Sequence, residues 1–158
     1  MAILYVLDTN VVSELMRERP EPAVLQALTA LDDSAWHIAT MTEEQLRHGV
    51  ALLNTGRKKT RLHTALLALL AQDFAGRILP FGSAATAYYA DIMATRSKAG
   101  RPMQVQDAMI AASCLAHVAT LVTRNTRDFE GVGVEMVNPW GCRASGTLRC
   151  AYAPTDSK

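Results

Sequence analysis

The chain has 158 residues, and 49% of them are apolar, which is enough for one domain with a substantial core and excludes a disordered protein. The formal net charge is only +1, so no global charge indicates a nucleic-acid partner. The three cysteines lack metal-ligand spacing, and the first apolar run is too short for a membrane span, so we expect a protein of the reducing cytoplasm with no membrane segment.

The first predicted element is a buried strand over residues 3–7, which ends in the polar triplet Asp8-Thr9-Asn10. Continuous apolar β-formers are typical of strands covered on both faces of a parallel sheet. The carboxyl ends of such strands are where open α/β sheets place their sites. Two interpretations stay open. Asp8 binds a divalent metal, or Asp8 or Asn10 merely caps the helix that begins near Val11.

Two helices are predicted over residues 11–19 and 23–31, followed by a short strand over residues 37–40. Thr42 matches the N-cap of the next helix, and Gln45 completes a Thr-x-x-Gln capping box. Both predictions rest on local pattern alone.

Residues 57–61 form the only dense basic cluster, predicted as a loop, and a leucine-rich helix over residues 62–75 follows it. Such a cluster is more often a solvated loop than a binding patch. Leucines at this density indicate a buried face or a helix–helix contact, part of which we expect to be with a second copy of the chain.

A third strand over residues 77–81 precedes another helix, and a buried helix over residues 105–117 carries Asp107 in its first turn. A fourth strand over residues 120–123 and a fifth over residues 134–137 follow. Strands that alternate with helices predict a five-stranded, mainly parallel sheet with helices on both sides. We expect one domain over residues 1–140. Residues 141–158 lack periodicity and are expected to form a flexible tail, partly derived from a cloning vector.

Three acidic residues share one topological position. Asp8, Asp107 and Asp128 each follow a strand or open a helix, on the rim to which strand carboxyl ends point. If the first and fourth strands are neighbours, these carboxylates converge and need a hard cation such as Mg²⁺ or Mn²⁺. Such a site suits hydrolysis of a phosphodiester. The alternatives are that Asp107 only opposes the helix dipole and that Asp128 is solvated surface.

Several motifs, in order, resemble those of PIN-domain toxins of the VapC and FitB-like kind. They are Leu7-Asp8-Thr9-Asn10-Val11-Val12-Ser13-Glu14, Thr42-x-x-Gln45-Leu46-Arg47-x-Gly49-Val50, Gly76-Arg77-Ile78-Leu79-Pro80-Phe81, Asp107-Ala108-Met109-Ile110-Ala111-Ala112, Thr123-Arg124-Asn125-Thr126-Arg127-Asp128-Phe129 and Asn138-Pro139-Trp140. The resemblance covers about residues 2–140. It implies a three-layer α/β/α PIN-like domain.

The resemblance also implies an Mg²⁺-dependent ribonuclease toxin, often aimed at tRNA, that forms a homodimer. Its partner would be a VapB- or FitA-like antitoxin whose tail blocks the acidic pocket and which alone contacts promoter DNA. Carried over by position, Asp8 and Asp107 would bind the metal, and Asp128 and the position of Gln45 would complete the catalytic set. Residues that would support the pocket are Thr9, Asn10, Thr123 and Asn125.

One position departs from the family pattern, because Gln45 stands where the second motif normally has Glu. An amide oxygen is a weaker ligand for Mg²⁺ than a carboxylate. Either the chain has reduced metal affinity and activity, or the residue was changed to silence a toxic enzyme. The alternative function is a catalytically weak domain that mainly binds an antitoxin and tunes DNA binding by the complex.

A haloacid-type phosphohydrolase also begins with an apolar strand and Asp, but it needs a second Asp where this chain has Asn10. We therefore set that class aside. Basic residues that could contact RNA phosphates without sequence choice are Arg47, Arg57, Lys58, Lys59, Arg96, Lys98 and Arg101.

Overall fold

The computed structural model describes residues 3–32 and 35–141. Its centre is a five-stranded sheet in the order β3-β2-β1-β4-β5, and all four strand pairings are parallel. The strands are β1 (Leu4–Leu7), β2 (Trp36–Ala39), β3 (Ile78–Leu79), β4 (Ala119–Val122) and β5 (Met136–Val137). The predicted α/β class is therefore confirmed, and the sheet is wholly rather than mainly parallel.

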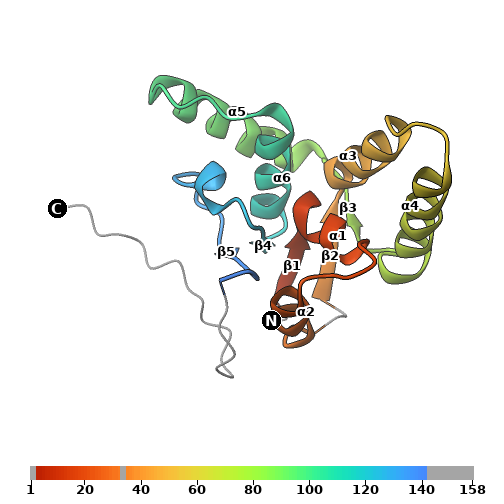
Figure 1. Cartoon of the computed structure of the whole chain (residues 1–158). Coiled ribbons are helices and arrows are strands. Elements are labelled where there is room, and N and C mark those ends of the chain that lie inside the picture. The colour runs from red at the N-terminus through yellow and green to blue at the C-terminus, as the bar shows by residue number, and fades with distance from the viewer. Residues whose placement is uncertain (1–2, 33–34, 142–158) are drawn as a thin grey trace.

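Helices cover both faces of the sheet (Figure 1). The helices are α1 (Thr9–Leu15), α2 (Pro22–Thr29), α3 (Thr40–Ala51), α4 (Arg57–Ala68), α5 (Ser83–Lys98) and α6 (Val105–Ala116), with a π turn η2 (Leu69–Asp73) and a 3₁₀ turn η3 (Thr126–Phe129). None of the helices in the described ranges is long and apolar enough to cross a membrane.

Neighbouring residues of the central strands point to opposite cores, as the strand period of two requires. Val6 of β1 and Leu121 of β4 pack on the side of α5 and α6. Leu7 and Val122, one residue further along each strand, pack on the side of α1 to α4. All four side chains are fully buried. The two cores fix the register of β1 against β4, and with it the rim where both strands end.

The first helix differs from its predicted range of residues 11–19. It begins at Thr9, because Asp8 is its N-cap and accepts a hydrogen bond of 2.8 Å from the Thr9 N–H. The capping interpretation of Asp8 is therefore correct as geometry. It engages only Oδ1, so the second carboxylate oxygen stays available for other partners.

The predicted capping box of the third helix is wrong. The helix begins at Thr40 with Ala39 as its N-cap, and no side chain caps it. Thr42 therefore lies inside the helix, fully buried, and its hydroxyl has no hydrogen-bond partner among the described residues. Because Gln45 is not tied to its own helix N-terminus, it can bond elsewhere.

The basic cluster at residues 57–61 is the first part of α4 rather than a loop. Gly56 precedes the helix, and the helix continues to Ala68 before the π turn η2. On this helix Leu66 is fully buried, whereas Leu67 is 43% exposed. The helix therefore turns one leucine toward the core while presenting its cationic first turns to solvent.

Candidate functional site

Asp8 occupies the rim where β1 ends. Its side chain is 5% exposed, and its Oδ2 accepts hydrogen bonds from the Thr123 hydroxyl at 2.7 Å and from Asn10 Nδ2 at 3.2 Å. Burial raises the pKa of Asp8, and the bonds from Thr123, Thr9 and Asn10 oppose that shift. These donors make a buried carboxylate tolerable, but none of them brings a positive charge.

Asp107 lies in the first turn of α6 and is half-buried. Its pKa is raised to about 6, first by burial and then by the charges of Asp8 and Asp128. Within the described residues no hydrogen-bond donor or cation contacts the Asp107 side chain. Three acids from distant parts of the chain are therefore close enough to repel one another, as the topological argument predicts.

Asp128 belongs to η3, which follows β4, and its side chain is exposed. Its charge also raises the pKa of Asp8, behind burial. Arg96 fixes the backbone of this loop, because its Nη1 donates to the Asp128 carbonyl at 3.1 Å and to the Glu130 carbonyl at 3.0 Å. Asp128 thus adds a solvent-exposed negative charge near the other two acids.

The predicted support residues connect these elements. Thr123 is fully buried; its hydroxyl donates to Asp8 and accepts the Asn125 N–H at 3.0 Å. Asn10 donates to the same hydroxyl at 3.4 Å, and its Oδ1 accepts the Arg124 N–H at 3.2 Å. Asn125 takes part through its backbone. This network joins the end of β1 to the loop after β4.

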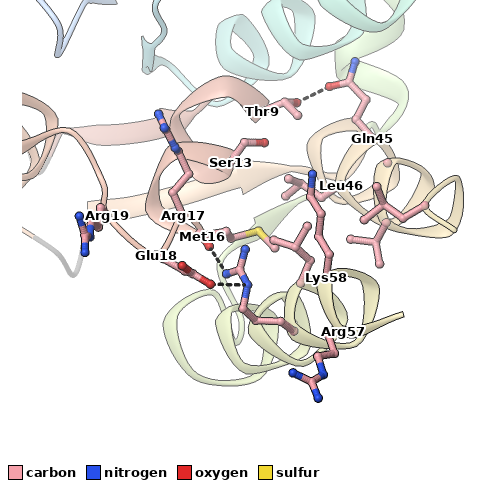
Figure 2. Close-up of a pocket in the computed structure, with 15 residues that line it drawn as sticks. Thr9, Ser13, Met16, Arg17, Glu18, Arg19, Gln45, Leu46, Arg57 and Lys58 are labelled. Atoms are coloured by element: carbon pink, nitrogen blue, oxygen red, sulfur yellow. Dashed lines mark hydrogen bonds and ion pairs between the residues drawn. The ribbon is translucent and has the colours of Figure 1, made fainter. Parts of the chain in front are cut away.

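Gln45 reaches the site from α3. Its Oε1 accepts a short hydrogen bond from the Thr9 hydroxyl, and Figure 2 shows the two side chains pointing toward each other. Gln45 is half-buried. The contact brings the position of the second motif to the residue next to Asp8, even though the amide carries no charge.

The potential metal ligands at this rim are oxygen atoms of carboxylate, hydroxyl and amide side chains. Mg²⁺ and Mn²⁺ prefer such ligands. Within residues 3–32 and 35–141, no group of three or more His, Cys, Asp or Glu side chains is arranged to hold a metal. Mg²⁺ binds through one or two carboxylates and keeps several waters, so Asp8 and Asp107 fit its needs.

A groove of about 880 Å³ opens beside Gln45 and Thr9 and runs between α1, α3 and α4. Its floor is apolar, and its lining includes Met16, Leu46, Val50, Leu53 and Leu62. Figure 2 shows the Thr9–Gln45 pair at one end and Arg57 at the other.

The rim of this groove is cationic. Arg61 is held by the Met16 carbonyl at 3.2 Å and by Glu18 at 3.3 Å. Arg19, Arg57 and Lys58 also line the groove, and no carboxylate among the described residues pairs with them. The groove therefore offers an apolar floor with positive charge at its edge.

The predicted RNA-contacting residues do not form one patch. Arg57 and Lys58 line the groove, but Arg47 pairs with Glu43 at 2.8 Å on the exposed side of α3. Lys59 donates to the Ala51 carbonyl at 3.1 Å. Arg101 lies 3.8 Å from a Glu130 oxygen.

Arg96 was also a candidate for RNA contact, and the structure corrects that placement. It is only 9% exposed, and its Nε donates to the Arg101 carbonyl at 2.7 Å in addition to its bonds at Asp128 and Glu130. Its role as a clamp on the Asp128 loop has no signal in the sequence, because its partners are backbone carbonyls of distant residues.

Comparison with known proteins gives a consistent result. Residues 5–135 match the model of the PIN domain family. The chain is 36% identical to VapC ribonuclease Y4jK of Sinorhizobium fredii, covering 87% of this chain and 98% of that protein. It is 39% identical to toxin FitB of Neisseria gonorrhoeae, covering 87% of this chain and 99% of that protein.

Solved structures agree with the sequence relatives. A structure of FitAB bound to an IR36 DNA fragment superposes with a TM-score of 0.81 at 36% identity, covering 89% of this chain and 98% of that one. FitAcB from Neisseria gonorrhoeae gives a TM-score of 0.78 at 38% identity, covering 88% and 100% of the two chains.

Proposed function

This chain belongs to the PIN domain family, and on that premise we propose that it is a metal-dependent endoribonuclease, the toxin of a toxin–antitoxin pair. The observation that carries the proposal is the gathering of Asp8, Asp107 and Asp128 at one rim, without a protein cation among them in the described residues. The names of the relatives, a VapC ribonuclease and a FitB toxin, support the same activity.

In this proposal Asp8 and Asp107 hold Mg²⁺ or Mn²⁺, with Asp128 nearby on the open side. When bound, the metal would supply charge neutralisation at the scissile phosphate and a lower pKa for a bound water. The chain's own contribution is orientation. Thr123 and Asn10 hold the Asp8 carboxylate in one position, and Thr9 holds the side chain of Gln45.

Gln45 would weaken this site, because the second motif of the family that the chain resembles normally has Glu at this position. The Thr9 hydroxyl bonds to an oxygen of Gln45, and a carboxylate oxygen could accept the same bond. Position 45 can therefore present an oxygen acceptor to Thr9 as either Gln or Glu. The amide preserves this geometry but lacks the charge that would help to bind a divalent cation.

We propose a VapB- or FitA-like antitoxin as the partner, because a relative at 36% identity was solved as the FitAB complex with DNA. Its tail would lie in the groove between α1, α3 and α4, where apolar side chains meet the floor and acidic ones meet Arg19, Arg57 and Lys58. Promoter DNA would be contacted by the antitoxin alone. Reversal of charge at Arg57 and Lys58 should weaken the complex in calorimetry, and unchanged affinity would refute this placement.

Three finer proposals accompany the function. The PIN domain spans residues 1–140, with residues 141–158 as a tail of which residues 142–158 lie outside the described part. The toxin acts in the cytoplasm on RNA, possible substrates including tRNA. It forms a homodimer, for which the exposed Leu67 of α4 offers one apolar contact. A monomeric mass by light scattering would refute the last of these.

The test compares the chain that has the sequence printed above, called the natural chain below, with its Asp8→Asn and Gln45→Glu variants on total RNA, with and without Mg²⁺. We expect metal-dependent cleavage that is lost in Asp8→Asn, and growth arrest on expression that is lost in parallel. Asp91→Asn, an exposed residue of α5, is the matched control and should behave as the natural chain. Absence of cleavage by both the natural chain and Gln45→Glu would contradict the proposal.

The alternative function, a catalytically weak partner that serves mainly to bind an antitoxin, is favoured by one observation, the uncharged Gln45 at the site. It predicts that Asp8→Asn leaves growth and RNA unchanged while binding of the antitoxin persists. The experiment above therefore separates the two functions.

A further inference from the structure

Arg124 lies two residues beyond the end of β4 and takes no part in the proposed metal site. Its backbone N–H donates to Asn10 Oδ1 at 3.2 Å, and Asn10 in turn donates to Asp8 at 3.2 Å. The main chain of Arg124 is therefore fixed relative to the carboxylate rim by two consecutive hydrogen bonds.

The side chain of Arg124 is fixed by an aromatic ring. Its Cζ lies over the ring of Trp140, 5.1 Å from the centroid. Trp140 is partly buried against the core on the side of α1 to α4, and its backbone N–H donates to Asn138 Oδ1 at 3.0 Å. A guanidinium held over the ring of a packed indole is restricted in its orientation.

The contact with the Trp140 ring is not a hydrogen bond, so it leaves the N–H groups of the Arg124 guanidinium free to donate. Arg124 is exposed, and its side chain makes no hydrogen bond or ion pair with any residue in the described ranges. Arg96, which contacts the same loop, differs from Arg124 because its guanidinium donates to three backbone carbonyls. The guanidinium of Arg124 is thus held over a ring, while its N–H groups have no acceptor among the described residues.

The charge of Arg124 acts beside the acid rim and not inside it. The pKa of Glu14 on α1 is lowered mainly by the backbone N–H of Glu21, and Arg17 and Arg124 contribute to the same shift. The charges that act on Asp107 are those of Asp8 and Asp128. Because the main chain of Arg124 is hydrogen-bonded to Asn10, which itself donates to Asp8, a ligand of Arg124 would lie next to the acid rim.

We propose that Arg124, oriented by Trp140, binds a phosphate of the RNA strand that neighbours the phosphate cleaved at the acid rim. A planar fork of donors matches two oxygens of a phosphodiester. The contact would fix the strand along the rim without reading its sequence. This inference rests on the proposed ribonuclease function and adds a substrate-binding residue to it.

The test measures binding of a short, labelled, single-stranded RNA of mixed sequence by fluorescence anisotropy, in EDTA, over a series of KCl concentrations. Arg124→Met should raise Kd roughly 5- to 20-fold, and it should reduce the slope of log K against log salt by about 0.7, the value for one phosphate contact on a single strand. Arg124→Lys should keep the slope, because it keeps the charge, while still weakening binding.

Trp140→Leu should weaken binding in the natural chain but have no added effect in Arg124→Met, because it acts through Arg124. Arg77→Met removes the same charge just before β3, at the edge of the sheet opposite the acid rim, and should change Kd less than twofold. Thermal unfolding checks that each variant is folded, and Arg124→Gln replaces Arg124→Met if the latter is not.

Two results would overturn the inference. If the natural chain cleaves RNA and Arg124→Met shows the same Kd and salt slope, Arg124 does not bind phosphate and the ribonuclease function stands. If the natural chain and Gln45→Glu neither bind nor cleave RNA, the proposed function fails and the inference fails with it.

Discussion

The hydroxyl of Thr123 donates a buried hydrogen bond of 2.7 Å to Asp8 Oδ2, and so joins the ends of β4 and β1 through their side chains. Val122 and Leu7, the preceding residues, are register partners in the parallel ladder. The sheet therefore places the donor, and the donor orients the carboxylate on which the proposed site depends.

Thr123→Val preserves the size and branching of this side chain and removes its hydroxyl. Asp8 loses a donor that lowers its pKa, so the pKa should rise further and the folded state should lose about 1.5–3 kcal/mol at neutral pH. Urea unfolding measures the loss. Thr60→Val, at an exposed threonine of α4, is the control and should cost far less. Equal losses in the two variants would show that the Thr123 bond has no special weight.

The stability of the metal-free protein should depend on Asp107. Its pKa is raised from 3.8 to about 6 in the folded state, so the folded chain holds this proton more tightly than the unfolded chain does. The stabilising contribution is complete below about pH 4 and is lost as the pH rises through about 6. We expect a higher Tm at pH 5 than at pH 7 from this group.

Asp107→Asn is the matched variant for this pH dependence, because it has nearly the same shape and does not titrate. The difference in Tm between pH 5 and pH 7 should shrink in the variant. Addition of Mg²⁺ to the natural chain at pH 7 should restore stability, since the cation offsets the repulsion among the acids. A pH dependence identical in both chains would contradict the assignment to Asp107.

Gln45→Glu adds a carboxylate beside Thr9 and next to Asp8. The added charge should raise affinity for Mg²⁺ and RNA cleavage by about 10-fold or more, the size of effect seen when groups around a metal are changed. Cleavage at a fixed, limiting concentration of Mg²⁺ is the measurement. Gln26→Glu, on the exposed side of α2, adds the same charge elsewhere and should leave the rate unchanged. Equal rates in all three chains would show that position 45 is unimportant.

Arg96→Leu removes three hydrogen bonds to the carbonyls of Arg101, Asp128 and Glu130. Loss of these buried contacts should destabilise the fold by roughly 2–4 kcal/mol and loosen the Asp128 loop. Urea unfolding and the rate of proteolysis at residues 124–131 report the two effects. Lys98→Met, two residues further along α5, should be nearly neutral. If the loop in Arg96→Leu is as resistant to protease as in the natural chain, Arg96 is not its clamp.

Local pattern was sufficient where the signal was local. The apolar run before Asp8 predicted β1, and the alternation of strands and helices predicted the layers, which the sheet confirms. The convergence of the acids depended on the condition that the first and fourth strands are neighbours, and the pairing of β1 with β4 meets that condition. The same topology explains why the charge of Asp8 contributes to the raised pKa of Asp107. Their roles as metal ligands stay predictions.

Pattern failed where a distant contact decided the outcome. Thr42 and Gln45 have the spacing of a capping box, but α3 begins two residues earlier and Gln45 bonds to Thr9 of another helix. The basic cluster is helical because α4 packs Leu66 into the core. Arg96 looks like a surface cation until the fold surrounds it with carbonyl groups.

The most direct measurement is a calorimetric titration of the metal-free chain with Mn²⁺. The account predicts binding at one site that is weakened at least about 10-fold by Asp8→Asn and likewise by Asp107→Asn, since each removes one of the two carboxylate ligands. Asp91→Asn should bind Mn²⁺ as the natural chain does. If either rim variant retained the full affinity of the natural chain, the shared metal site would be contradicted.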